Sequence, residues 1–373
     1  MASEFVVLNQ AIRAGTFPLL PVVPEELATA QPESFTILPT YRCNAACREC
    51  CFESHPGIKH RMSRDELLKL IRRVREELPS VRYVVLTGGE VTLLRKDLLD
   101  AIALLTELGL GSRIVTNGHW ARTDSDAARW VKDLISAGLA ELNLSTGDEH
   151  LEWVPTESVA RAALHATRNQ LLTIVTIEGT ADAKFRLEEF QKLSQIREVL
   201  SDDKLRRWLV VMTNVWMPFH SDSGIRQDED ITEAKGCDNI FDNFVVNPYG
   251  NLMSCCGLTM EYIPEMKVGH VSAPGTLQQV YGSQFDDLLK LWIWLDGTRS
   301  IFELARRRCG QPVEPTSPHH CAICAQLYQN PQLRSTIQEM VIEKADEIVF
   351  RSSVKARLNG RVGSRNKHHV NRG

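Results

Sequence analysis

Three cysteines near the start of the chain are the residues best suited to chemistry. Cys43, Cys47 and Cys50 have the spacing C-x3-C-x2-C and follow an apolar run over 35–39 that predicts a strand ending in a turn. Three thiolates this close can ligate one soft metal centre, whereas a fully ligated 4Fe–4S cluster takes four. A cluster with only three protein ligands keeps one iron open for another molecule. The spacing also fits half of a zinc site, completed by a nearby histidine, or a set of buried apolar thiols.

Length and composition indicate a globular protein with room for two domains. The chain has 373 residues, of which 43% are hydrophobic, and a net charge of −4, which does not suggest a surface that coats nucleic acid. It has no apolar run of 18 residues and no signal pattern, so we expect a soluble, cytoplasmic protein. Ten cysteines in such a chain favour metal ligation over disulfides.

Apolar runs and amphipathic stretches alternate from residue 35 to about residue 215. The runs that predict strands are 35–39, 83–87, 113–116, 140–145, 171–177 and 208–213. Helices are predicted after the capping box at 63–66 and over 96–108, 125–137, 156–169 and 185–200. Such alternation implies a parallel sheet with right-handed crossovers. Six units are too few for a closed eight-stranded barrel, so we expect an open, partial (β/α)6 TIM-like barrel.

Polar residues follow these strands at their carboxyl ends, where parallel sheets place their chemistry. The second strand runs into Gly88-Gly89-Glu90, in which the glycines allow a close backbone approach and the carboxylate can pair with an ammonium group. The third ends in a turn signal at Thr116 and Asn117. Later strand ends carry Ser145, Asp148, His150 and Glu178.

These motifs resemble those of the radical S-adenosylmethionine (SAM) enzymes. In that family the cysteine loop holds a 4Fe–4S cluster, and SAM chelates the open iron through its amino and carboxylate groups. The resemblance implies that the Gly-Gly-Glu segment holds the SAM amino group and that Ser145 contacts the ribose or carboxylate. The cofactor-binding residues implied in this way are Gly88, Gly89, Glu90, Thr116, Asn117 and Ser145.

The same resemblance places candidate catalytic residues after the fourth and fifth strands. Asp148 and His150 would point toward the substrate as proton acceptors or hydrogen-bond anchors, and Glu178 is a further candidate. Equally, these residues could cap the turn that follows the strand. Two positions depart from the family pattern: Glu49 stands where an aromatic residue is common, and Val91 where proline often follows the Gly-Gly-Glu segment. Neither change removes a ligand.

A second group of cysteines lies far downstream. Cys237, Cys255, Cys321 and Cys324 occur in an order that resembles the auxiliary-cluster module called SPASM, and in particular its shorter twitch form. The resemblance implies that these four hold a second 4Fe–4S cluster with no open iron, which would take or relay an electron. A four-cysteine zinc site is the alternative. A hairpin is predicted from the runs at 243–246 and 251–254. Cys51 is expected to be a buried thiol, and the sequence assigns no role to Cys256 and Cys309.

The sequence thus predicts four segments. They are an N-terminal lead-in at 1–34, the partial barrel at 35–230, a small α+β twitch domain at 231–330, and a C-terminal helix and basic tail at 331–373. The helix is expected over 331–350. From residue 349 onward there are basic but no acidic residues, so a disordered, solvated tail is expected.

The resemblance implies a radical SAM oxidoreductase. We expect it to cleave SAM reductively to a 5′-deoxyadenosyl radical, to abstract hydrogen from a C–H bond of a peptide, and to oxidise the product through the auxiliary cluster. Expected partners are the substrate, a flavodoxin- or ferredoxin-type electron donor and a separate leader-peptide-binding protein. The alternatives are a dehydrogenase of a small metabolite such as a sugar or aminocyclitol, and a non-catalytic iron–sulfur sensor or scaffold.

Overall fold

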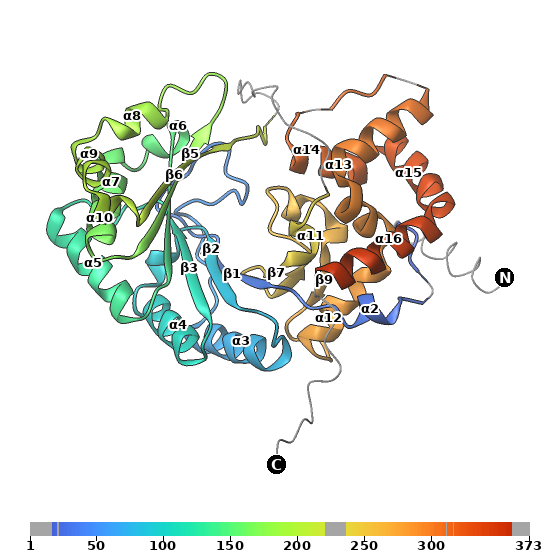
Figure 1. The fold of residues 1–373 in the computed structure, drawn as a ribbon, viewed down its shortest axis with the longest axis horizontal. Coiled ribbons are helices and arrows are strands. Elements are labelled where there is room, and N and C mark those ends of the chain that lie inside the picture. The colour runs from blue at the N-terminus through green and yellow to red at the C-terminus, as the bar shows by residue number, and fades with distance from the viewer. Residues whose placement is uncertain (1–16, 21, 221–235, 311, 316, 360–373) are drawn as a thin grey trace, which may run out of the picture.

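The strands of this protein form one continuous sheet. The computed structural model describes residues 17–20, 22–220, 236–310, 312–315 and 317–359 (Figure 1). Nine strands lie in the order β6-β5-β4-β3-β2-β1-β7-β8-β9. Their bounds are β1 Ser34–Thr40, β2 Tyr83–Gly88, β3 Gly111–Thr116, β4 Glu141–Thr146, β5 Leu172–Gly179, β6 Leu209–Val215, β7 Asn243–Val246, β8 Asn251–Met253 and β9 Lys267–His270.

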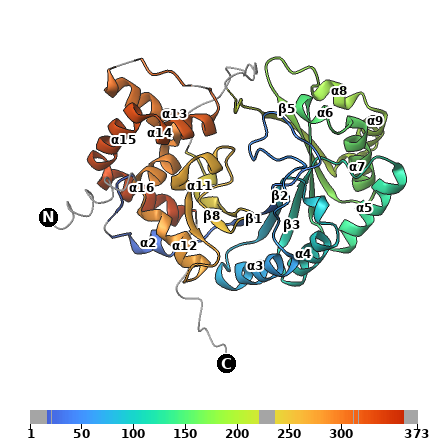
Figure 2. The same cartoon turned by 180° about the vertical axis from the view of Figure 1, so that it is seen from behind.

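Strands β1 to β6 are parallel to one another and form the expected partial barrel. Its main crossover helices are α3 Arg64–Glu77, α4 Lys96–Glu107, α5 Asp124–Ser136, α7 Thr156–Arg168 and α9 Ser194–Ser201. They cover the outer face of the sheet (Figure 1, Figure 2). Helix α3 begins with the predicted capping box, in which Ser63 and Glu66 each bond the other's backbone N–H. The predicted fold class is therefore confirmed.

The prediction of one continuous helix over 185–200 is wrong. The segment instead forms α8 Leu187–Gln191 and α9, which α10 Asp203–Arg206 follows. Leu193 breaks the helix because its backbone is extended, with φ −62° and ψ 137°. This change of direction leaves both Phe190 and Ile196 fully buried. Periodicity alone did not show the break, since apolar residues continue at helical spacing on both sides of it.

The region after the barrel extends its sheet and then becomes helical. Strand β7 pairs in parallel with β1, and β7 and β8 form the predicted hairpin. Strand β9 pairs with β8 and was not predicted. The following helices are α12 Leu277–Ser283, α13 Leu288–Cys309, α14 His320–Gln329, α15 Pro331–Glu343 and α16 Ala345–Leu358. Short helices elsewhere are α2 Glu25–Ala28, α6 Asp148–Leu151 and α11 Asn239–Asp242.

The prediction for the C-terminal segment needs two corrections. The single helix expected over 331–350 is two helices, which Lys344 separates with φ −99° and ψ 4°. The basic segment expected to be disordered from residue 349 continues α16 to Leu358. This part of the helix buries Ser352 and Ala356, and its cations have acidic partners: Arg351 lies 2.5 Å from Asp296, and Lys355 lies 2.9 Å from Asp238. The rest of the predicted tail, after residue 359, is outside the described residues.

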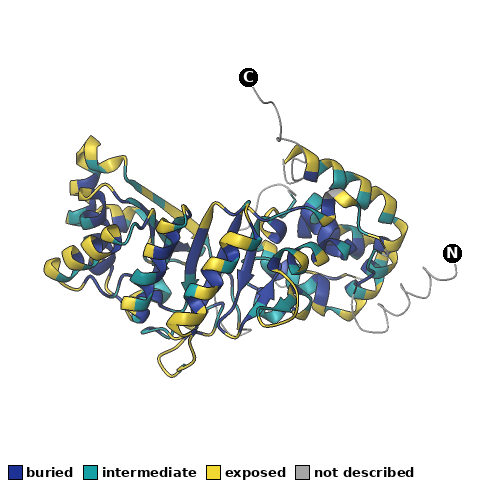
Figure 3. Cartoon of the chain, turned by 90° about the horizontal axis from the view of Figure 1, so that it is seen from below, coloured by how far each residue is buried: buried dark blue, intermediate teal, exposed yellow. Residues whose placement is uncertain are grey.

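Burial is concentrated between the sheet and its covering helices (Figure 3). In the C-terminal part, aromatic side chains form the centre of the core, and Phe241 packs between Phe285 and Trp294. The lead-in joins this part, since Leu19 bridges to Asp287. Within the described part of the chain, no helix combines the length and the apolarity needed to cross a lipid bilayer.

Candidate active site

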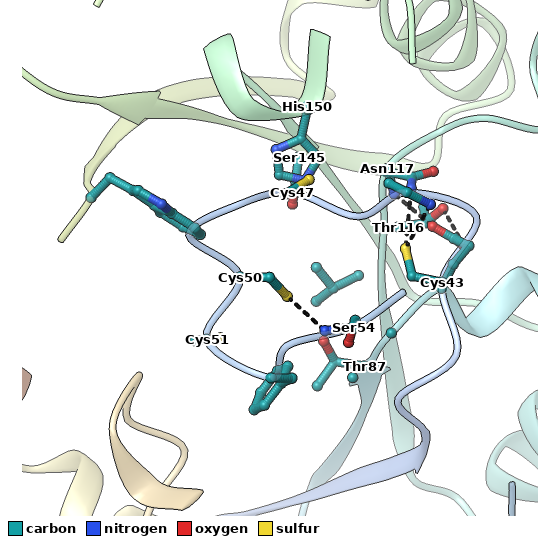
Figure 4. A pocket seen from close by; sticks show the side chains of 17 residues that line it. Cys43, Cys47, Cys50, Cys51, Ser54, Thr87, Thr116, Asn117, Ser145 and His150 are labelled. Atoms are coloured by element: carbon teal, nitrogen blue, oxygen red, sulfur yellow. Dashed lines mark hydrogen bonds between the residues drawn. The ribbon is translucent and has the colours of Figure 1, made fainter. Parts of the chain in front are cut away.

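A cavity of about 210 Å³ lies at the carboxyl ends of β2, β3 and β4, beneath the loop that follows β1 (Figure 4). The loop wraps over the strand ends because β1 and β2 are neighbours in the sheet and end at the same edge. The predicted site residues that line this cavity are Cys43, Cys47, Cys50, Gly88, Gly89, Glu90, Thr116, Asn117, Ser145 and His150. Residues from four separate stretches of sequence are thus brought together.

The cysteine thiols are held by hydrogen-bond donors from the protein. The backbone N–H of Ala45 donates to Cys43 Sγ at 3.4 Å, and that of Ser54 donates to Cys50 Sγ at 3.5 Å. Asn117 Nδ2 donates to Asn44 Oδ1 at 3.0 Å and lies 3.8 Å from Cys43 Sγ. Such donors favour the thiolate form that a metal centre requires.

Without a bound cation, Cys43 and Cys47 strongly favour the neutral thiol over the thiolate. Burial, followed by the charge of Glu90, raises the pKa of Cys43 to about 12. Burial and the negative charge of Glu178 also raise the pKa of Cys47 well above its ordinary value. A bound cationic centre reverses this preference, because coordination deprotonates a thiol outright. Cys43 and Cys47 are therefore suited to the thiolate form only together with a positive partner.

The donor set fits an iron–sulfur cluster by its chemistry. The three soft thiol donors of the C-x3-C-x2-C motif face one cavity, which the adjacent, buried Cys51 also lines. Among the described residues, no three His, Cys, Asp or Glu side chains gather as a site for a single metal ion. A cluster is larger than one ion and accepts thiolates that stand farther apart.

The two glycines make room for the cysteine loop. A Cβ atom on Gly89 would lie 2.2 Å from the carbonyl oxygen of Arg42 and 2.7 Å from the carbonyl carbon of Tyr41. The backbone N–H of Gly89 donates to Thr40 O at 2.8 Å, and that of Glu90 donates to Arg42 O at 2.8 Å. The glycines therefore serve a close approach of the chain to itself, which fixes the loop just before Cys43.

Glu90 is 1% exposed and nearly saturated by protein donors. Its Oε1 accepts hydrogen bonds from the backbone N–H and the hydroxyl of Thr92 and from Thr116 Oγ1 at 2.7 Å. Its Oε2 accepts one from the backbone N–H of Asn117 at 2.9 Å. Each carboxylate oxygen offers about two lone-pair sites. Among the described residues, Oε2 has this single donor, so it retains one acceptor position at the cavity wall.

His150 is the candidate catalytic residue that lines the cavity. Its Nδ1 bonds Glu178 Oε1, and the backbone N–H of Glu149 donates to Glu178 Oε2 at 3.0 Å. Burial lowers the pKa of His150, but the charge and hydrogen bond of Glu178 outweigh it, so the pKa is raised. Glu178 thus lies behind His150 and orients it. Gly147 allows this approach, because its φ is +145° and a Cβ there would lie 2.5 Å from Glu178.

Asp148 does not line the cavity. Its carboxylate accepts hydrogen bonds from the backbone N–H groups of Lys184 and Phe185 at 2.8 and 2.9 Å. These amides belong to the loop between β5 and α8, so Asp148 ties that loop to the end of β4. Of the three candidate catalytic residues, the structure brings His150 and Glu178 together and leaves Asp148 in a loop contact.

The downstream cysteines also converge. Cys255 follows β8, Cys321 and Cys324 lie on one face at the start of α14, and the backbone N–H of Cys237 donates to Ile293 O of α13 at 3.0 Å. A Cβ on Gly257 would lie 3.3 Å from Cys321 Sγ and 3.5 Å from Cys255 Sγ, so both sulfurs face this glycine.

All four thiols are partly buried and act on one another electrostatically. Burial, then the charges of Cys255, Cys321 and Cys237, raise the pKa of Cys324 far above its ordinary value. Burial and Cys321 raise the pKa of Cys237 to about 11. Cys309 is not part of this set, since its thiol lies 3.1 Å from Thr336 Oγ1. The charge of the buried Lys290 opposes the increase at Cys324. Four soft donors fit a second metal centre by their chemistry.

Residues 37–163, which contain β2 to β4, the end of β1 and most of the residues that line the first cavity, match the family model of the radical SAM superfamily. This segment of the chain is therefore similar to a radical SAM domain. The Bacillus subtilis (strain 168) protein YydG, provisionally named a peptide biosynthesis protein, is 25% identical over 127 residues. This match covers 34% of the chain and 40% of YydG, so the chain spans well under half of its curated relative.

The likeness to solved structures extends beyond residues 37–163. The structure of native anSMEcpe with bound AdoMet (S-adenosylmethionine) has a TM-score of 0.52 and 14% sequence identity. The alignment covers 82% of this chain and 99% of that chain. At this identity the likeness shows the fold, including the parallel sheet and the region that follows it.

Sequence reasoning missed Trp216 at the first cavity and the contacts that Glu49 makes beside it. Trp216 lines this cavity directly after β6, where attention to strand ends would have found it. Glu49 is fully buried, and its Oε2 accepts hydrogen bonds from the backbone N–H groups of Phe219 and His220 at 2.6 and 3.1 Å. The Glu49 amide in turn donates to Glu149 Oε2 at 3.2 Å. The position before the third cysteine therefore joins the cysteine loop to the segment after β6.

Proposed function

We propose that this chain is a radical SAM enzyme that abstracts hydrogen from a C–H bond of a peptide and oxidises the product with an auxiliary 4Fe–4S cluster. The observation that carries the proposal is the shared cavity: the three thiols of the C-x3-C-x2-C loop face the ends of β2, β3 and β4. A sensor or scaffold would not need strand ends that can bind a second ligand beside its cluster.

In this proposal Cys43, Cys47 and Cys50 hold the first cluster, and SAM lies against the strand ends. When bound, the first cluster with SAM supplies a 5′-deoxyadenosyl radical, and the second supplies a one-electron acceptor. The spare acceptor position on Glu90 Oε2 suits the SAM ammonium group. Asn117 and Ser145 line the same wall and offer polar contacts to the rest of SAM.

We assign to His150 the role of the base that accepts a proton from the substrate. Loss of a hydrogen atom and then an electron leaves the substrate carbon centre with a proton to release, and a base must take it. Glu178 accepts from Nδ1–H of His150, which leaves the Nε2 lone pair free to act as that base. Because His150 lines the cavity, the acceptor stands where the substrate must come. Asp148 is assigned only the loop contact.

Cys237, Cys255, Cys321 and Cys324 would hold the auxiliary cluster. Four protein ligands leave no open iron, which suits an electron acceptor rather than a substrate ligand. The mutual electrostatic coupling of their buried thiols supports a common centre. An external donor of flavodoxin or ferredoxin type would reduce the first cluster, and a separate leader-peptide-binding protein would present the peptide.

The peptide substrate is supported by the provisional name of YydG, which assigns that relative to peptide biosynthesis. The radical SAM match itself favours no substrate class. A peptide also suits the open side of the partial barrel, where an extended chain can enter.

The test is anaerobic reconstitution followed by iron counting and SAM cleavage with dithionite. Wild type should carry about eight irons and form 5′-deoxyadenosine, as two 4Fe–4S clusters require. The double variant Cys321→Ala/Cys324→Ala should keep about four irons and SAM cleavage but lose the oxidised product. The matched control is Cys309→Ala, which removes a thiol bonded to Thr336 and should keep about eight irons. Full product yield from the double variant would defeat the oxidation mechanism.

A further inference from the structure

The sheet has two edges, and they differ in how they are protected. Edge strand β9 has four residues, carries Lys267 and packs against α12. Edge strand β6 has seven residues, Leu-Val-Val-Met-Thr-Asn-Val, without a charge, proline or glycine. Natural proteins usually blunt edge strands by shortness, charge or proline, because an unprotected edge recruits another strand. Strand β6 has none of these protections.

Two hydrogen bonds show which backbone groups of β6 face outward. The N–H of Thr173 donates to Trp208 O, and the N–H of Trp216 donates to Gly179 O, both at 2.8 Å. Backbone groups of a strand alternate in direction, so the even-numbered residues between these two face β5. The N–H and C=O groups of Leu209, Val211, Thr213 and Val215 therefore point away from the sheet. The structure gives these groups no partner among the residues that it describes.

The inner face of β6 is apolar and open. Val210 pairs with Ile174, Met212 with Thr176, and Asn214 with Glu178, so each pair shares one face of the sheet. Glu178 bonds the cavity residue His150, which identifies this face as the inside of the barrel. Val210 and Met212 are nevertheless 46% and 49% exposed. An additional strand would cover them.

Strand β6 leads directly to the cavity. Its carboxyl end at Val215 is followed by Trp216, which lines the cavity with the three thiols. From Val211 to Trp216 an extended chain covers about 17 Å. A peptide segment of about six residues beside β6 therefore reaches from the middle of the strand to the cavity.

We propose that β6 is the docking edge for the substrate, an extended peptide that pairs with β6 as a seventh strand of the barrel. This inference rests on the proposed function and adds the binding mode. The outward amides and carbonyls bind the peptide backbone, and alternate side chains of the peptide cover Val210 and Met212. The docked strand carries its next residues to the cavity beside Trp216.

The probe is a dodecapeptide selected from a random display library against the reconstituted full-length protein, then synthesised with a fluorophore. The variant Val211→Pro removes an outward N–H and keeps the ladder to β5 intact, since proline is tolerated at such edge positions. Its matched control, Val211→Thr, keeps the N–H. We expect fluorescence anisotropy to show about fivefold to tenfold weaker binding for the proline variant only.

The peptide supplies a second test that leaves the protein unchanged. N-methyl groups on one alternate set of peptide residues should weaken binding about tenfold, and those on the other set should not. The peptide should also protect the amides of Val211 and Thr213 from hydrogen exchange. If no peptide is selected, the peptide substrate of the proposed function fails together with the docking edge. If peptides bind but show neither the alternation nor sensitivity to Val211→Pro, the docking edge alone is overturned.

Discussion

The substitution Gly89→Ala tests how the first cysteine loop is positioned. The new Cβ would lie 2.2 Å from Arg42 O, whereas real Cβ atoms essentially never approach closer than 3.0 Å, so the backbones must separate by at least about 0.8 Å. The obstructing atoms are backbone atoms of Tyr41 and Arg42, which cannot move aside as a flexible side chain can. Gly89 itself has an ordinary φ, so steric overlap is the sole cost of the change.

The overlap should cost stability and displace Cys43, which follows Arg42 directly. Overpacking of this kind costs about 1–3 kcal/mol in unfolding free energy. A displacement near 1 Å in a catalytic geometry can cost about a hundredfold in rate. We therefore expect 5′-deoxyadenosine formation to fall about a hundredfold, and iron in the first site to fall with it, while the second site stays loaded.

Gly111→Ala is the matched control. It lies at the start of β3 in the same barrel, its φ is also ordinary, and its Cβ would meet Tyr83 Cβ at an acceptable 3.4 Å. This variant should keep iron and SAM cleavage near the wild-type level. Iron analysis, 5′-deoxyadenosine assay and thermal unfolding separate a local effect from misfolding. Wild-type rates from Gly89→Ala would refute the argument that this contact positions the loop.

Three further predictions concern other contacts of the barrel. Ser63→Ala removes the N-cap of α3 and should cost about 1 kcal/mol, measured by urea unfolding, because the Glu66 amide loses its acceptor. Glu49→Ala should accelerate hydrogen exchange at the Phe219 amide at least about tenfold, since bonds to a charged acceptor are strong; unchanged exchange would contradict the contact. Glu178→Gln should destabilise the protein more at pH 6 than at pH 9. The raised pKa of His150 stabilises the fold fully below about pH 6.5, and this contribution is lost as the pH rises through the pKa of His150 in the folded protein. A loss of stability that does not depend on pH would disprove this coupling.

Much of the cavity could be predicted because its residues obey a local rule. A strand followed by a polar or glycine-rich turn is visible in the sequence, and parallel strands bring their carboxyl ends to one edge. That rule located Glu90, Asn117, Ser145 and His150, all of which line the cavity. It applies equally to Trp216, which was overlooked after the sixth strand.

The remaining contacts depend on partners far away in the chain. Glu49 bonds amides 170 positions downstream, so no local pattern reveals why a carboxylate precedes the third cysteine. Asp148 bonds the loop at 184–185 instead of facing the cavity, which the sequence around it does not indicate. Arg351 is ordered by Asp296, 55 positions upstream. From charge and spacing alone, such residues can be predicted only as solvated or catalytic. Their hydrogen-bond and ion-pair partners come close only when the chain folds.

The continuous sheet connects the regions that carry the two cysteine sets. Strand β1, which precedes the first cysteine loop, pairs with β2 on one side and on the other with β7, whose hairpin partner β8 precedes Cys255. A small apolar cluster containing Leu38, Val245 and Met253 lies on this layer, and Cys255 and Cys256 pack against it. The first loop contacts the same cluster through Tyr41 and Phe52, so both cysteine sets border one apolar group.

The same arrangement bears on the proposed entry of the substrate. Because β7 occupies the free side of β1, the barrel is closed toward the auxiliary set and its other edge, β6, is left exposed. In the proposed function, electrons would leave through the closed side and the substrate would arrive through the open side. The two proposed paths therefore use different edges of the same six-stranded unit.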